Sequence, residues 1–152
     1  MNSLDLINQI KENLKDYPIE YLKKKASDER YPDSITKRLA IYNSSVYDEI
    51  FESNPEDFEI RDVVIENLSA DVDYYFSVND PYDDENREFT KNLCLYLALI
   101  AKKPLHPVGD PSSYHVYQQN GEYKCRDRIL YLKDERSLCR YCICKNEGYG
   151  FF

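Results

Sequence analysis

The chain has 152 residues, of which 42% are hydrophobic and 32% are charged, and its formal net charge is −8 at pH 7. This length and balance fit one folded domain with its own core, and they exclude a disordered or fibrous protein. The longest uncharged stretch, residues 92–101, has about half the length of a bilayer-spanning helix, and the first residues lack the apolar core of an export signal. We therefore expect a cytoplasmic protein with no membrane partner.

The charge is distributed unevenly. Residues 121–145 carry seven basic and four acidic side chains, whereas the first 120 residues carry 13 basic and 23 acidic ones. An acidic surface repels nucleic-acid backbones, and a small local excess of positive charge does not reverse that repulsion, so nucleic acid is not an expected partner. The 15 tyrosines leave a protein partner open, since Tyr is enriched at interfaces but also packs at helix edges.

Apolar spacing predicts helices over the first two thirds of the chain. Leu4, Ile7 and Leu14 fit one face of a first helix, and Pro18 ends it or opens a second helix that begins near Ile19. A stripe of residues three or four apart predicts a third helix. Its members are Ile35, Leu39, Tyr42, Val46 and Ile50.

Two further helix starts are marked by a capping residue that is followed by proline. Asn54 and Pro55 predict the start of a fourth helix. Its buried face continues through Ile60, Val64, Leu68, Val72 and Phe76. The same signal at Asp80 and Pro81 opens a helix that is apolar on nearly all sides by residues 89–103, and we expect it to be the central helix.

The pattern changes after Lys103, where prolines break any helix and alternating residues flank an Asn120-Gly121 turn, which is typical of a β-hairpin. The sequence therefore predicts a mainly α protein in a single domain, residues 1–152. A bundle of four or five helices (residues 1–103) carries a small C-terminal β-hairpin and a Cys-rich metal-binding cap (residues 104–152).

The metal prediction rests on four cysteines in this cap. Cys139 and Cys142 are three residues apart, so both can bind one ion from a tight turn. Cys125, at the end of the hairpin, can supply a third sulfur. A tetrahedral ion needs a fourth ligand, and Cys144, His106 and His115 are the candidates. A small cap with few aliphatic residues would gain stability from such a cross-link.

The simpler alternative is that the cysteines are reduced and buried, because free Cys packs as a small hydrophobe. This alternative fits Cys94, which lies in the apolar run LCLYL. The thiols of the terminal cluster are instead interleaved with charged residues, which favours a metal site. Disulfides are disfavoured by a cytoplasmic location.

The run KPLHPVGDPSSYHVYQQNGEYKC, followed by LCRYCIC, resembles the C-terminal signature of domain of unknown function 2115, an uncharacterised family of methanogenic archaea. The resemblance covers about the last third of the chain. The family pattern falls on His106, Pro107, Val108, Gly109, Cys125, Leu138, Cys139 and Cys142.

This chain departs from the family pattern at two places: it has DPSSY where the family has a Phe-Pro-Gly-Gly turn, and Arg126 where the family has a proline. Position 144 is typically a small residue in the family. The resemblance thus favours His106 over Cys144 as the fourth ligand, and it implies no reaction.

Three Cys and one His in a closed shell predict structural zinc, and an iron-sulfur cluster is the alternative cofactor. Two classes of function remain open. The first is a binding or regulatory protein whose zinc holds the cap in shape. The second is an enzyme or electron carrier in which the metal is the reactive centre. No catalytic residue can be assigned from the sequence.

Overall fold

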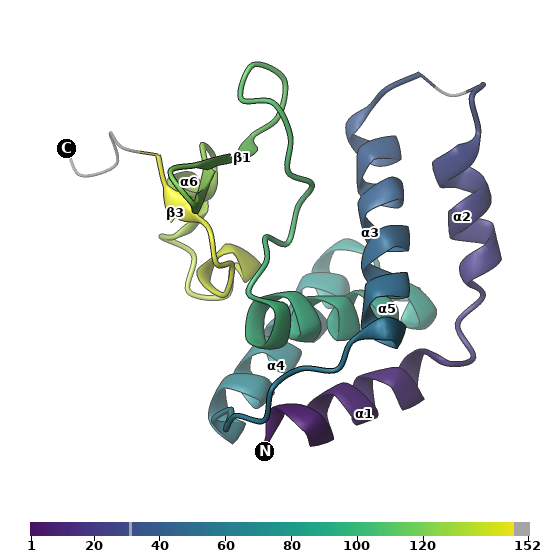
Figure 1. The fold of residues 1–152 in the computed structure, drawn as a ribbon, viewed down its shortest axis with the longest axis vertical. Coiled ribbons are helices and arrows are strands. Elements are labelled where there is room, and N and C mark those ends of the chain that lie inside the picture. Colours follow the sequence, from purple (N-terminus) through teal and green to yellow (C-terminus); the bar gives the residue numbers. More distant parts are fainter. Residues whose placement is uncertain (31, 148–152) are drawn as a thin grey trace.

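The structure is a computed structural model, and it describes residues 1–30 and 32–147. The first two thirds of the chain are helical, as predicted (Figure 1). The helices are α1 (Ser3–Leu14), α2 (Ile19–Ser27), α3 (Ile35–Glu52), α4 (Asp62–Asn79) and α5 (Asp84–Leu95), which continues as a π-helical segment, η1 (Tyr96–Ala101).

The centre of the helical part is α5 with η1. Asp83 caps α5 by accepting a hydrogen bond from the backbone N–H of Asn86, so the cap of this helix lies three residues after the expected one, Asp80, which instead ends α4. Every residue from Asn92 to Ile100 is buried, and α1, α3 and α4 pack against this segment. The prediction of a central helix is confirmed. The helix ends at Lys102, which adopts a left-handed conformation with φ 56°.

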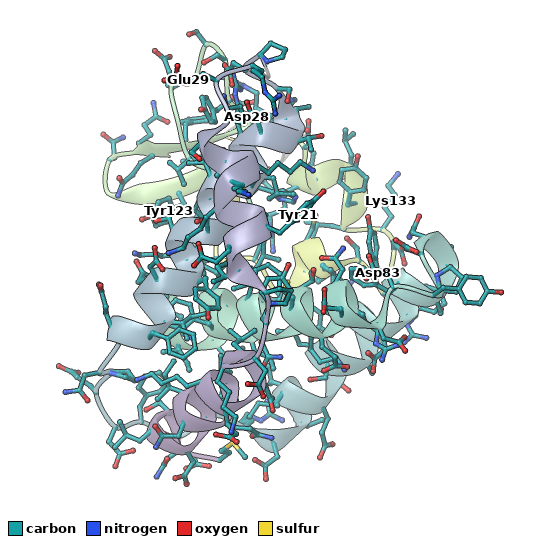
Figure 2. All side chains as sticks on the ribbon, turned by 90° about the vertical axis from the view of Figure 1, so that its right-hand side faces the viewer. Tyr21, Asp28, Glu29, Asp83, Tyr123 and Lys133 are labelled. Carbon is teal, nitrogen blue, oxygen red and sulfur yellow. The ribbon has the colours of Figure 1, made fainter. Side chains whose placement is uncertain are left out.

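Helices α2 and α3 form an antiparallel pair at one side of the molecule (Figure 1). Asp28 and Glu29 lie at the tip of this pair, where α2 leads towards α3 (Figure 2). Val46 and Ile50, in the second half of α3, are buried, whereas Ile35 at its start is 75% exposed. The apolar stripe therefore predicted the helix correctly but not the burial of its first turn, which extends beyond the core.

The fourth helix begins later than its capping signal predicts. It starts at Asp62 rather than after Asn54, because the intervening segment pairs with the start of the chain. The backbone N–H of Ser3 donates to the carbonyl of Phe58 at 2.8 Å, and the Ser3 hydroxyl donates to the carbonyl of Glu56 at 2.6 Å. These tertiary contacts outweigh the local preference for helix.

The C-terminal part (residues 104–147) contains a small sheet. Strands β1 (Val116–Gln119) and β2 (Glu122–Cys125) form the predicted hairpin, and Asn120 and Gly121 both have positive φ, as a type I′ turn requires. A third strand, β3 (Lys145–Asn146), pairs in parallel with β2 and was not predicted. The short helices α6 (Arg128–Tyr131) and η2 (Leu138–Arg140) lie between β2 and β3.

The sheet and α6 lie on the opposite side of α3 from α2 in the view of Figure 1. Among the residues that the structure describes, no helix combines the length and the apolar character needed to cross a bilayer.

The burial of η1 makes a test of its central place possible. Leu97 is 1% exposed, so Leu97→Ala should lower the free energy of unfolding by about 2–5 kcal/mol through lost packing. Leu130, which is 69% exposed, offers a matched control. Leu130→Ala should change the free energy of unfolding by less than about 0.5 kcal/mol. Urea unfolding followed by circular dichroism measures both, and equal effects would contradict the central place of η1.

Candidate metal centre

Four of the five cysteines lie in the C-terminal part, on three short segments. Cys125 ends β2, Cys139 lies in η2, and Cys142 and Cys144 lie on the segment that leads into β3. Cys144 is 3% exposed, and the other three are half-buried. Cys125 pairs with Asn146 across the β2–β3 ladder, so the end of the hairpin lies beside the segment that follows Cys142 and Cys144.

Cys142 and Cys144 interact directly. The thiol of Cys144 donates a hydrogen bond to the sulfur of Cys142, and this bond is the main reason that the pKa of Cys142 lies well below its usual range. The backbone N–H groups of Cys144 and Leu105 also donate to the Cys142 sulfur. The same thiol–thiol bond raises the pKa of Cys144, which therefore keeps its proton.

Cys125 and Cys139 have a different environment. Burial raises the pKa of both thiols, and the nearby sulfur of Cys142 raises it further. The backbone N–H groups of Asp127 and Arg128 oppose this effect at Cys125, because both donate to its sulfur. Backbone N–H groups aimed at sulfur stabilise the thiolate, which is the form that binds a metal ion.

Arg128 is a residue of the site that sequence reasoning missed. Its guanidinium donates through Nε to the carbonyl of Cys139 and through Nη1 to Oδ1 of Asn146, both at 3.2 Å. Its positive charge lowers the pKa of Cys139, Cys142 and Cys144. No sequence signal identified it, because a basic residue three positions after a cysteine is also common on a solvated surface.

The two histidines lie beside the thiols rather than among them. His106 follows Leu105, whose N–H reaches Cys142, and its side chain is at the surface. Neighbouring groups still desolvate the imidazole enough to lower its pKa; the charge of Asp127 opposes this shift and that of His115 adds to it. Nδ1 of His115 is 2.8 Å from the carboxylate of Asp127, so this nitrogen already has a partner.

Cys94 is separate from this group in the sequence. It lies within α5 and is 7% exposed, and burial raises the pKa of its thiol to about 12. Its predicted packing in the core is confirmed. Among residues 1–30 and 32–147, no three Cys, His, Asp or Glu side chains have converged into an arrangement that could hold a metal ion. The metal centre and its ligands stay a prediction.

Comparison with known proteins extends the family resemblance from the last third of the chain to nearly all of it. The profile of a family described as "Uncharacterized protein conserved in archaea (DUF2115)" matches residues 2–147. The chain belongs to this family. A UPF0305 protein of Methanocaldococcus jannaschii is 25% identical over 96% of this chain and 97% of its own length. No solved structure matches this chain. The family profile thus covers the helical part of the chain as well as its last third.

The geometry explains the glycine of the family's His-Pro-Val-Gly turn. Val108 bridges to Val116, and the N–H of Gly109 donates to the carbonyl of Val116 at 3.1 Å, so the turn lies along β1. A Cβ atom at position 109 would lie 2.3 Å from a ring carbon of Tyr114. Any side chain at this position would displace that ring, which the guanidinium of Arg38 covers at 4.0 Å.

The departure from the family pattern at position 126 also has a structural consequence. The backbone N–H of Arg126 donates to the carbonyl of His115 at 3.1 Å, a bond that the family's proline would lack. The guanidinium of Arg126 donates to the carbonyl of Tyr114 at 2.9 Å and lies over the ring of Tyr117. Arg126 thus closes the loop that follows Gly109 by contacts of its own side chain.

One polar contact fastens the cysteine-bearing segments to the helices. Asp71 of α4 is 8% exposed, and its carboxylate accepts hydrogen bonds from the hydroxyl of Tyr141 at 2.5 Å and from Nε of Arg136 at 3.0 Å. Tyr141 lies between Cys139 and Cys142. Burial and the Asp71 carboxylate raise the pKa of Tyr141 to about 12, so its hydroxyl stays protonated at neutral pH.

Tyr141→Phe tests this contact. Removing the hydroxyl leaves the buried carboxylate short of one donor and should cost about 1–2 kcal/mol in the docking of the C-terminal part. Backbone hydrogen exchange should accelerate in residues 104–147 and stay unchanged in α5. Tyr131→Phe is the control, because Tyr131 is 53% exposed. The backbone amides of this variant should exchange at the wild-type rates. Equal protection in Tyr141→Phe and wild type would show that the bond does not hold this part in place.

Proposed function

We propose that the C-terminal part binds one structural zinc ion through Cys125, Cys139 and Cys142, with a fourth ligand from His106 or Cys144. In this proposal the protein is a cytoplasmic binding or regulatory protein, and the ion holds the C-terminal part in the shape that presents its surface to a partner.

The arrangement of hydrogen bonds around the sulfur atoms is the observation that carries this proposal. Backbone N–H groups from two separate segments point at Cys142, and two more point at Cys125. Thiolates that bind metal ions commonly accept hydrogen bonds from such donors, which orient the ligand and offset its charge. Arg128 adds a cation beside three of the thiols.

The weak core of the C-terminal part supports the same proposal. Among residues 104–147, four residues are buried. They are Pro104, Val116, Tyr117 and Cys144. A segment of this size with so little apolar burial gains little stability from packing alone. A bound ion that joins β2, η2 and the segment before β3 would replace the missing core.

Two residues compete for the fourth position, and different observations support each. Cys144 already donates a hydrogen bond to the Cys142 sulfur, so the two sulfurs are in contact. His106 is next to the amide that donates to Cys142, and its lowered pKa keeps it neutral, as a metal-binding imidazole must be. The family resemblance adds weight to His106.

The alternative function is an iron-sulfur protein or a metalloprotein with an open coordination site. A surface depression that reaches Cys142 and Cys144 favours it, because an outside molecule could approach the ion there. Absorption between about 400 and 450 nm after anaerobic purification would identify the cluster, and its absence in a metal-loaded protein would support zinc.

The decisive measurement is metal per chain in single variants. Wild-type protein should carry one ion, and Cys125→Ser, Cys139→Ser and Cys142→Ser should each lose most of it, because a neutral hydroxyl is a poor ligand. His106→Asn and Cys144→Ser separate the two candidates, since only loss of the true fourth ligand should lower the stoichiometry strongly.

Cys94→Ala is the matched control. It should leave the metal content unchanged and lower the free energy of unfolding by about 1 kcal/mol through lost packing. Circular dichroism of every variant should retain its helical signal, which shows that a loss of metal is not a loss of the helical part. Wild-type protein that carries no metal when purified anaerobically without chelator would refute the proposal.

A further inference from the structure

A depression of about 460 Å³ opens on the surface between the end of η1 and strand β3. Cys142 and Cys144 line it, and so do Lys102, which follows η1, and Lys145 of β3. This volume lies within the range of sites that take small molecules. The depression shares Cys142 and Cys144 with the proposed metal site, whereas its other lining side chains are not proposed as ligands of the ion.

The lining is positively charged. Lys102, Arg128 and Lys145 all line the depression, and no acidic side chain does so among the residues that the structure describes. Lys102 and Lys145 are exposed, and neither forms an ion pair within residues 1–30 and 32–147. In a chain with a net charge of −8, three basic groups around one hollow are an exception, and the single thiolate among them, Cys142, leaves an excess of positive charge that favours an anion.

Arg128 and Asn146 both line the depression and are hydrogen-bonded to each other. Nε and Nη1 of Arg128 are used by the carbonyl of Cys139 and by Oδ1 of Asn146. Because Asn146 accepts through its oxygen, its amide N–H groups remain available to a ligand. The guanidinium is held in place at both of these atoms, so it is preorganised for an oxyanion and loses little freedom on binding.

Part of the lining is apolar. Ala98, Tyr141 and Ile143, which is 39% exposed, line the depression, and the hydroxyl of Tyr141 is bonded to Asp71. An inorganic ion would leave these side chains uncovered. A ligand that carries an anionic group and a flat apolar group would use both halves of the depression.

We propose that this depression binds a small organic phosphate, whose phosphate group is held by Lys102, Arg128 and Lys145 and whose apolar group packs on Ile143 and Tyr141. A phosphate monoester carries a charge of about −1.5 to −2 at pH 7, which matches three cations better than a carboxylate does. Arg and Lys together are the side chains that recognise phosphate in proteins.

Phenyl phosphate is a suitable probe, and calorimetric titration of the protein as purified measures its binding. It should bind at one site with a Kd below about 1 mM at low salt, and more weakly as sodium chloride is added, because exposed cations are screened. Inorganic phosphate and benzoate should each bind more weakly, since the first lacks the apolar group and the second lacks the second charge.

Lys102→Gln and Lys145→Gln should each weaken the binding of phenyl phosphate by about tenfold, as expected for the loss of a charged hydrogen-bond donor. Lys133→Gln is the control, because Lys133 is exposed in the same part of the chain and does not line the depression (Figure 2). Metal content should equal that of the wild type in all three variants, since none of these residues is a proposed ligand of the ion.

Two results would overturn the proposal. The first is the absence of saturable binding of phenyl phosphate, or an equal loss of affinity in Lys133→Gln, Lys102→Gln and Lys145→Gln. The second is equal affinity for inorganic phosphate and phenyl phosphate, which would show that no apolar group of the ligand packs on Ile143 and Tyr141. Either result would leave the metal stoichiometry of the cysteine variants unaffected, so the two proposals fail separately.

Discussion

The carboxylate of Asp71 holds together two parts of the molecule that have unequal cores. The helical part buries a continuous apolar segment from Leu93 to Ile100, whereas the C-terminal part buries little. A part with so few packed residues keeps a defined position only if it is anchored to something else. Tyr141 and Arg136 provide that anchor on α4, and the hydroxyl of Tyr42 on α3 adds a second by donating to the carbonyl of Pro104.

This anchoring decides where the chemistry of the protein can lie. Tyr141 directly precedes Cys142, so its bond to Asp71 holds that thiol in the depression that residues at the end of η1 also line. Arg128 then joins η2 to β3 and brings its charge to the same place. A zinc ion with three thiolates and a histidine has a net charge of −1, and Arg128 would offset it while facing the neighbouring depression. The two proposed sites therefore share one cation.

The parts of the fold that could be predicted are those whose signals are local. The burial of α5 follows from an apolar run that no surface helix would carry, and the hairpin follows from Asn120 and Gly121, which tolerate positive φ. The start of α4 could not be predicted, because Asn54 and Pro55 form a sound capping signal in isolation. Only the pairing of Ser3 with Phe58, more than fifty residues away, overrides it.

The candidate site divides in the same way. Cysteine spacing singles out Cys139 and Cys142, and the hairpin brings Cys125 near them, but strand β3 is two residues long and has no periodicity to detect. Arg128 and Asp71 belong to the site through contacts with residues distant in the sequence, so no local pattern marks them. Gly109 is the instructive case. It belongs to the family's turn, and a Cβ atom at this position would lie 2.3 Å from the ring of Tyr114, a constraint that only the folded chain reveals.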